Sequence, residues 1–108
     1  MPAAVLGDFE QLVLLALVRH GGDGYGASIG QDLAERTGRD VSLAAVYKTL
    51  ERLQDKGFVA SRIGAPTPER GGRRKRHYRV LAPGHRALVA SLGAIRRMTE
   101  GLGPEFEG

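Results

Sequence analysis

Several residue types and patterns that support common protein chemistries are missing from this chain. Its 108 residues contain no cysteine and no tryptophan. Without cysteine there is neither a disulfide framework nor a thiolate site, which favours a cytoplasmic protein. Without tryptophan, a ligand site built on indole stacking is excluded. No apolar run approaches the roughly 20 residues that span a bilayer, and the first six residues lack a signal-peptide pattern, so no membrane partner is expected.

Catalytic and metal-binding sets are missing as well. The sequence has no Ser/His/Asp set and no glycine loop followed by Lys-Ser or Lys-Thr, so we expect no enzyme activity and no cofactor. His20, His77 and His85 lie far from other residues at ligand spacing, which predicts no metal site. The length and the 42% hydrophobic content predict one small globular domain.

Residues 42–80 predict a helix followed by a two-stranded hairpin. Ser42 is a favourable N-cap, and Gly57 suits the left-handed position just beyond a helix end, so the helix is expected over 42–56. The hairpin strands are expected over 58–63 and 76–80. Apolar residues recur in the helix at spacings of three and four and predict a core-facing stripe of Leu43, Val46, Leu50 and Leu53.

The opposite face of this helix has short side chains near its start and cations further along. It comprises Ala45, Lys48, Thr49, Arg52 and Lys56. This order suits a helix that enters the major groove, with phosphate-binding cations behind its leading end. Arg52 is expected to hold the DNA backbone, and the residues expected nearest the bases are Ser42, Ala45, Tyr47, Lys48 and Thr49. An ordinary solvated face is the alternative on this pattern alone.

Positive charge is concentrated in the hairpin. The stretch 70–79 has six cations and no acid, whereas the whole chain has 16 cations and 12 acids, so the rest is left with 10 cations against 12 acids. Such a segment gains affinity by releasing counterions from a phosphate backbone, and arginine can enter a narrow minor groove. We therefore expect Arg73, Arg74 and Lys75 to contact DNA. The alternatives are a disordered basic loop or a membrane-surface patch.

The N-terminal part predicts two further helices. The first is expected over 8–20, capped by Asp8 with Gln11 as its capping-box partner. Its uninterrupted apolar run predicts that Val13 and Leu17 face a partner subunit. The second is expected over about 25–37, with Tyr25 at the end where the helix dipole favours an anion; a tyrosine packed on the core is the alternative. Residues 39–41 are a candidate short strand.

A last helix is expected over 83–102, with proline in its first turn. Its apolar residues alternate spacings of four and three, which is typical of a helix that pairs with another helix. We expect a homodimer whose interface includes, besides Val13 and Leu17, the residues Leu88, Leu92, Ile95, Met98 and Leu102.

The chain resembles the PadR-type transcriptional regulators over about residues 6–88. The resemblance rests on the stretches 7–17 and 25–26 and, above all, on Val-Tyr-Lys-Thr-Leu-Glu-Arg-Leu at 46–53 followed by the basic run at 66–80. His77 departs from an aromatic that is common in the family, and residues 81–84 depart from its usual lead-in to the last helix. The resemblance implies a small winged-helix repressor and places Tyr25 near a DNA phosphate.

Together these patterns predict a mainly α protein with a small β-hairpin. A winged helix-turn-helix is expected over residues 1–81 and a C-terminal dimerisation helix and tail over 82–108. The expected function is a homodimeric repressor that binds double-stranded DNA at an inverted repeat. The resemblance adds relief of repression by a small apolar or phenolic effector, or by another signal, at the dimer interface. The alternative is a winged helix used only for protein–protein contact.

Overall fold

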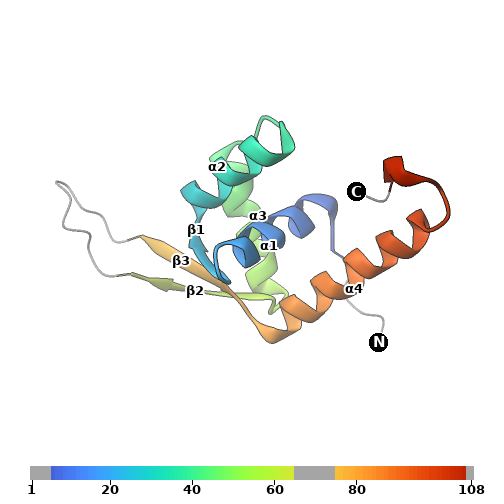
Figure 1. The fold of residues 1–108 in the computed structure, drawn as a ribbon. Coiled ribbons are helices and arrows are strands. Elements are labelled where there is room, and N and C mark those ends of the chain that lie inside the picture. Colours follow the sequence, from blue (N-terminus) through green and yellow to red (C-terminus); the bar gives the residue numbers. More distant parts are fainter. Residues whose placement is uncertain (1–5, 65–74, 107–108) are drawn as a thin grey trace.

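The computed structural model describes residues 6–64 and 75–106. Within them, helices dominate and three short strands form one sheet, so the predicted fold class is confirmed (Figure 1). In chain order the elements are α1 (Asp8–Arg19), β1 (Asp23–Tyr25), α2 (Gly26–Thr37), α3 (Leu43–Asp55), β2 (Val59–Ile63), β3 (Arg76–Val80), α4 (Ala82–Thr99) and the 3-10 helix η1 (Pro104–Phe106).

The sheet is antiparallel, with the strand order β1-β3-β2. The predicted hairpin is confirmed, with Val59 opposite Val80. The third strand was predicted at 39–41, which is wrong, because those residues form a loop and β1 occupies the other edge of β3. Gly21 and Gly22 have positive φ angles of 75° and 85°, so the chain reverses directly after α1 and runs back alongside β3.

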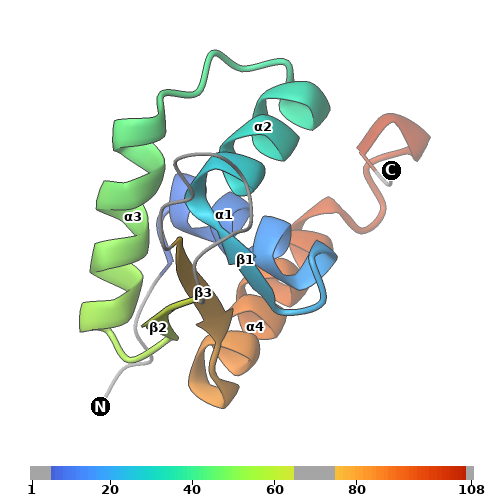
Figure 2. The ribbon, with the colours of Figure 1, turned by 90° about the vertical axis from the view of Figure 1, so that its left-hand side faces the viewer.

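Helix α1 lies at the centre of the molecule, between α2 and α3 on one side and α4 on the other (Figure 2). Val13 and Leu17 are fully buried in the chain's own core. Our prediction that they face a partner subunit is therefore wrong. The uninterrupted apolar run has a different reason: a helix surrounded by other elements must be apolar on several faces.

The start of α1 also differs from the prediction in its cap. The N-cap is Gly7, and Asp8 is already the first helical residue. Glu10, not Gln11, completes the cap, since its Oε1 accepts the Gly7 N–H at 2.7 Å.

Helix α4 packs on the body from its start to about Gly93, and only its last turns extend beyond the core. Gly84 lies so close to the end of α3 that a Cβ there would be 2.3 Å from the Phe58 carbonyl oxygen. Leu88 is 4% exposed and belongs to the same core as α1, so its predicted place in a dimer interface is wrong. The helix ends at Thr99 rather than at Leu102, because the chain turns away at Gly101, whose φ is +80°.

Candidate nucleic-acid interface

The ends of α3 are formed as the sequence predicts. The Ser42 hydroxyl accepts the Ala45 N–H at 3.1 Å, and Gly57 follows the helix with a φ of +78°. The hydroxyl of Ser42 therefore has a structural task at the helix start. Ser42 itself remains exposed, as do Ala45, Lys48 and Arg52.

The buried face of α3 is rotated relative to the predicted stripe. Val46, Leu50 and Leu53 are fully buried, but Leu43 is 47% exposed. Thr49 is only 1% exposed, so the prediction that it lies nearest the bases is wrong. The observed stripe is 46, 49, 50 and 53, which is the regular spacing of a helix face. The Thr49 hydroxyl accepts from Arg52 Nη2 at 3.3 Å.

An ion pair fixes the far end of α3 to α1. Lys56 was predicted on the solvated face, but its Nζ lies 2.8 Å from Glu10 Oε2 and 2.9 Å from Oε1. Burial raises the pKa of Glu10, yet the hydrogen bonds from Lys56 and from the Gly7 N–H lower that pKa more, so it lies below its usual value. The two residues are 46 positions apart. In the sequence, the only indication of this ion pair is that Glu10 is an acid in the first turn of α1.

Tyr25 lies at the start of α2 and is paired with His77 of β3. It is the N-cap residue of α2, as its predicted place at the helix start requires. The Lys75 ammonium lies 4.4 Å from the centre of its ring, and His77 meets the ring edge-on at 5.2 Å. These contacts hold a hairpin cation beside the start of α2. Arg73 and Arg74 lie outside the described residues.

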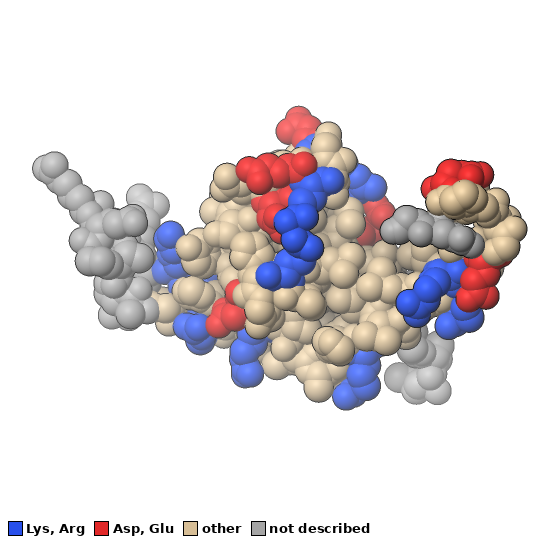
Figure 3. Space-filling view, in the orientation of Figure 1, with Lys and Arg blue, Asp and Glu red and all other residues tan. Residues whose placement is uncertain are grey.

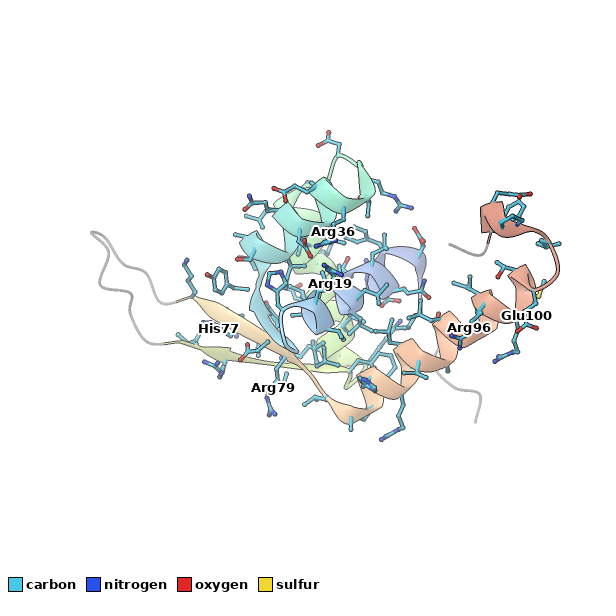
Figure 4. All side chains as sticks on the ribbon, viewed as in Figure 1. Arg19, Arg36, His77, Arg79, Arg96 and Glu100 are labelled. Atoms are coloured by element: carbon cyan, nitrogen blue, oxygen red, sulfur yellow. The ribbon has the colours of Figure 1, made fainter. Side chains whose placement is uncertain are left out.

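The Asp23 carboxylate of β1 contacts a side chain on each strand of the same hairpin. Asp23 Oδ2 lies 2.9 Å from Arg62 Nη2, and Asp23 Oδ1 lies 3.6 Å from His77 Nδ1. Arg79, two residues along β3 from His77, points away from the body of the molecule (Figure 4). The sequence pattern gave no sign of the Asp23 contacts, because their residues come from three different strands.

A hollow of about 570 Å³ joins α3 to the hairpin. Tyr47, which is 37% exposed, forms part of its wall, and burial raises the pKa of Tyr78 opposite. The lining mixes aromatic rings with two cations and one acid: Tyr25, Ala27, Tyr47, Glu51, Ile63, Lys75, Arg76 and Tyr78. The hollow brings three of the predicted site residues together, and it adds Arg76, which the sequence marked only as one cation of the basic run.

The surface charge is uneven. Lys and Arg side chains lie around the hairpin end and along the lower edge in Figure 3.

Among the described residues there is no group of three histidines or acids that could hold a metal ion. None of the helices within residues 6–64 and 75–106 is long and apolar enough to cross a membrane.

The outer half of α4 keeps the remaining predicted interface residues. Leu92 is partly buried against the core, whereas Ile95 is 50% and Met98 77% exposed. Leu102, beyond the helix end, is 57% exposed, and Phe106 in η1 is 56% exposed. The end of α4 and the segment after it, which carry the exposed apolar side chains, lie on the part of the molecule farthest from the hairpin (Figure 1).

A helix pair followed by a third helix and a basic β-hairpin defines a winged helix-turn-helix protein, with α3 as the recognition helix and the β2–β3 hairpin as the wing. The model of the transcriptional regulator PadR-like family matches residues 14–90. The chain belongs to this family of transcriptional regulators. No curated protein matches the sequence.

Solved structures share the fold. A PadR-like transcriptional regulator from Bacillus cereus ATCC 14579 has a TM-score of 0.72 at 17% identity, covering 93% of this chain and 92% of that one. A PadR family regulator from Eggerthella lenta DSM 2243 has a TM-score of 0.67 at 25% identity, covering 86% and 79%. Bacillus subtilis PadR in complex with operator DNA has a TM-score of 0.66 at 22% identity, covering 79% of this chain and 46% of that one.

Proposed function

We propose that this regulator is a homodimeric repressor that places α3 in the major groove of an inverted-repeat operator. The observation that carries the proposal is the shared hollow between α3 and the loop end of the wing strands, which Tyr47, Lys75 and Arg76 line together. Other exposed residues of α3 are short near its start, at Ser42 and Ala45, and cationic further along, at Lys48 and Arg52. Short side chains permit close approach to bases, and the cations bind phosphates on either side.

The wing is assigned to the DNA backbone or the minor groove beside α3. Replacing Arg73, Arg74 and Lys75 by alanine should weaken binding to every sequence alike. The slope of log affinity against log salt should flatten by about one unit for each lost phosphate contact. An unchanged slope would remove the wing from the interface.

Dimerisation is assigned to the outer half of α4. Ile95 and Met98 lie three residues apart on this helix and are both largely exposed, and exposed apolar side chains that share a helix face suit an interaction surface. A two-fold dimer presents two recognition helices to successive major grooves about 34 Å apart, so the bound DNA should be an inverted repeat. The family resemblance adds a small apolar or phenolic effector at the dimer interface that relieves repression.

Selection of bound sequences from random DNA tests this function directly. We expect enrichment of an inverted repeat, binding that weakens with salt, and release of the selected DNA by a member of a panel of phenolic acids. Enrichment of a single half-site would contradict the dimeric arrangement. Failure to enrich any sequence would favour the winged helix as a protein–protein module. If no phenolic acid releases the selected DNA, only the proposed effector is contradicted.

A further inference from the structure

The ring of Tyr47 occupies the space of a side chain that Gly26 does not have. Gly26 is the first residue of α2 and is buried. A Cβ on Gly26 would lie 2.5 Å from Tyr47 Cε1 and 2.6 Å from Cζ, far inside van der Waals contact. The recognition helix therefore rests its tyrosine directly on the backbone of the first turn of α2.

At position 26, glycine is required because it leaves room for the Tyr47 ring, and not because of its backbone conformation. Six other glycines among the described residues have positive φ angles, and Gly26 is not one of them. Its backbone conformation is open to any residue, and glycine weakens a helix relative to alanine. Gly30, one turn further along α2, offers a comparison: a Cβ there would be 3.5 Å from Val46 Cγ2, an ordinary contact.

The placement of Tyr47 leaves its hydroxyl free for an outside partner. Its Oη lies 3.0 Å from the position of a Gly26 Cβ, so the hydroxyl is held at the N-terminus of α2. It makes no hydrogen bond within the part of the chain that the structure describes, and Tyr47 is 37% exposed. Tyr25 and Lys75 line the same hollow. Tyr47 thus lines the hollow between the recognition helix and the wing, with its hydroxyl beside the start of α2.

We propose that Gly26 is a positioning residue for DNA binding, which holds Tyr47 where its hydroxyl donates to a phosphate of the DNA backbone. The proposal rests on the proposed function. The atoms that would clash belong to the far end of a side chain, so a methyl group on Gly26 should swing the ring away rather than disrupt the core. Gly26→Ala then displaces one DNA contact in a folded protein.

The matched pair Gly26→Ala and Gly30→Ala adds the same methyl group at two places on α2. We expect Gly26→Ala to weaken binding about tenfold to DNA selected by the unaltered chain, the scale of one hydrogen bond to a charged group. Gly30→Ala should bind normally and unfold at an equal or higher temperature. Normal binding by Gly26→Ala would overturn the proposal.

The dependence on Tyr47 is tested by combining substitutions. Tyr47→Phe should lose about as much affinity as Gly26→Ala, and the double variant of Gly26→Ala with Tyr47→Phe should bind no worse than either. Losses that multiply, or a Tyr47→Phe variant with normal affinity, would overturn the proposal. If Gly26→Ala instead lowers the unfolding temperature, adding Tyr47→Ala should restore it, and a failure to do so would show that the clash lies elsewhere.

A measurement without DNA separates this inference from the proposed function. In the free protein, the NMR signals of the Tyr47 ring should shift in Gly26→Ala and stay in place in Gly30→Ala. Unchanged Tyr47 signals in Gly26→Ala would refute the positioning role even if the chain binds DNA. If the unaltered chain binds no DNA while the signals shift as expected, the packing of Tyr47 on Gly26 stands, and both the DNA contact and the proposed function fail.

Discussion

Helices α3 and α4 carry similar apolar stripes, but only α3 buries its stripe along its length. Leu50 and Leu53 of α3 are fully buried against other elements of the chain. In α4, Leu88 is buried in the same core, whereas Ile95 and Met98 lie 50% and 77% exposed. The difference shows that helical spacing predicts a face that needs covering, and leaves open whether the same chain or a second copy covers it.

The largest effect is expected where α4 leaves the core. Ile95→Asp with Met98→Asp should give a folded monomer, because neither side chain is buried in the chain's own core. The two operator half-sites would then be bound separately. Linking two binding modules raises overall affinity by about 10²- to 10⁴-fold, so operator affinity should fall by a similar factor. Sedimentation measures the oligomeric state, and titration with operator DNA measures the affinity.

A control for this variant lies on the same helix. Ala90 is exposed and lies neither three nor four residues from Ile95 or Met98, so Ala90→Asp adds a negative charge elsewhere on α4. This variant should stay dimeric. A dimer that survives Ile95→Asp with Met98→Asp would place the interface outside the outer half of α4.

The buried stripe of α3 is tested by two equal substitutions in one helix. Leu50→Ala should lower the free energy of unfolding by about 2–5 kcal/mol, since it removes fully buried groups and leaves a cavity. Leu43→Ala removes the same atoms from a side chain that is 47% exposed, and should change the free energy of unfolding by no more than about 0.5 kcal/mol. Urea titration of both variants decides it; equal losses would contradict the rotated stripe.

Local signals in the sequence were enough to place α3 and the hairpin. Ser42 and Gly57 mark the helix ends through side-chain and backbone chemistry that acts within a few residues. Alternation along β3 agrees with the burial of Tyr78, which is 4% exposed. The prediction failed at Thr49 because its polarity suggested an exposed position, although its spacing from Val46 and Leu53 fits the buried face.

Features that join distant segments could not be read from the sequence. The strand β1 exists because it pairs with β3, and three residues carry too little pattern to show it. The Glu10–Lys56 pair and the packing of Tyr47 on Gly26 depend on how α1, α2 and α3 meet in space. The central position of α1 also depends on tertiary packing. It buries Val13 and Leu17, which the sequence had predicted to contact a partner subunit.

The ion pair that fixes α3 to α1 should appear in the pH dependence of stability. The folded-state pKa of Glu10 is lowered from an ordinary value of 4.5, so its contribution is fully present above about pH 4.5 and is lost as the pH falls through the lowered value. Glu10→Gln should cost about 1–3 kcal/mol at neutral pH, because it removes hydrogen bonds from a buried position.

Stability measured against pH gives the decisive comparison. The difference between the unaltered chain and Glu10→Gln should shrink as the pH falls below 4.5. Glu100→Gln alters an exposed acid after α4, and its curve should follow that of the unaltered chain. A Glu10→Gln deficit that stays constant down to low pH would assign the loss to packing and not to charge.

The smallest effect contrasts single cations on the two helices. Lys48 of α3 and Arg96 of α4 are both exposed, and neither forms an ion pair with a described residue. Lys48 follows Tyr47, which lines the hollow at the wing, in α3, whereas Arg96 lies on the outer half of α4 (Figure 4). Lys48→Ala should reduce the slope of log affinity against log salt by about one unit, the effect of one lost phosphate contact. Arg96→Ala removes an equal charge from the side of the molecule away from the recognition helix, so its slope should match that of the unaltered chain. Equal losses in both variants would mean that net charge, and not the placement of α3, governs binding to DNA.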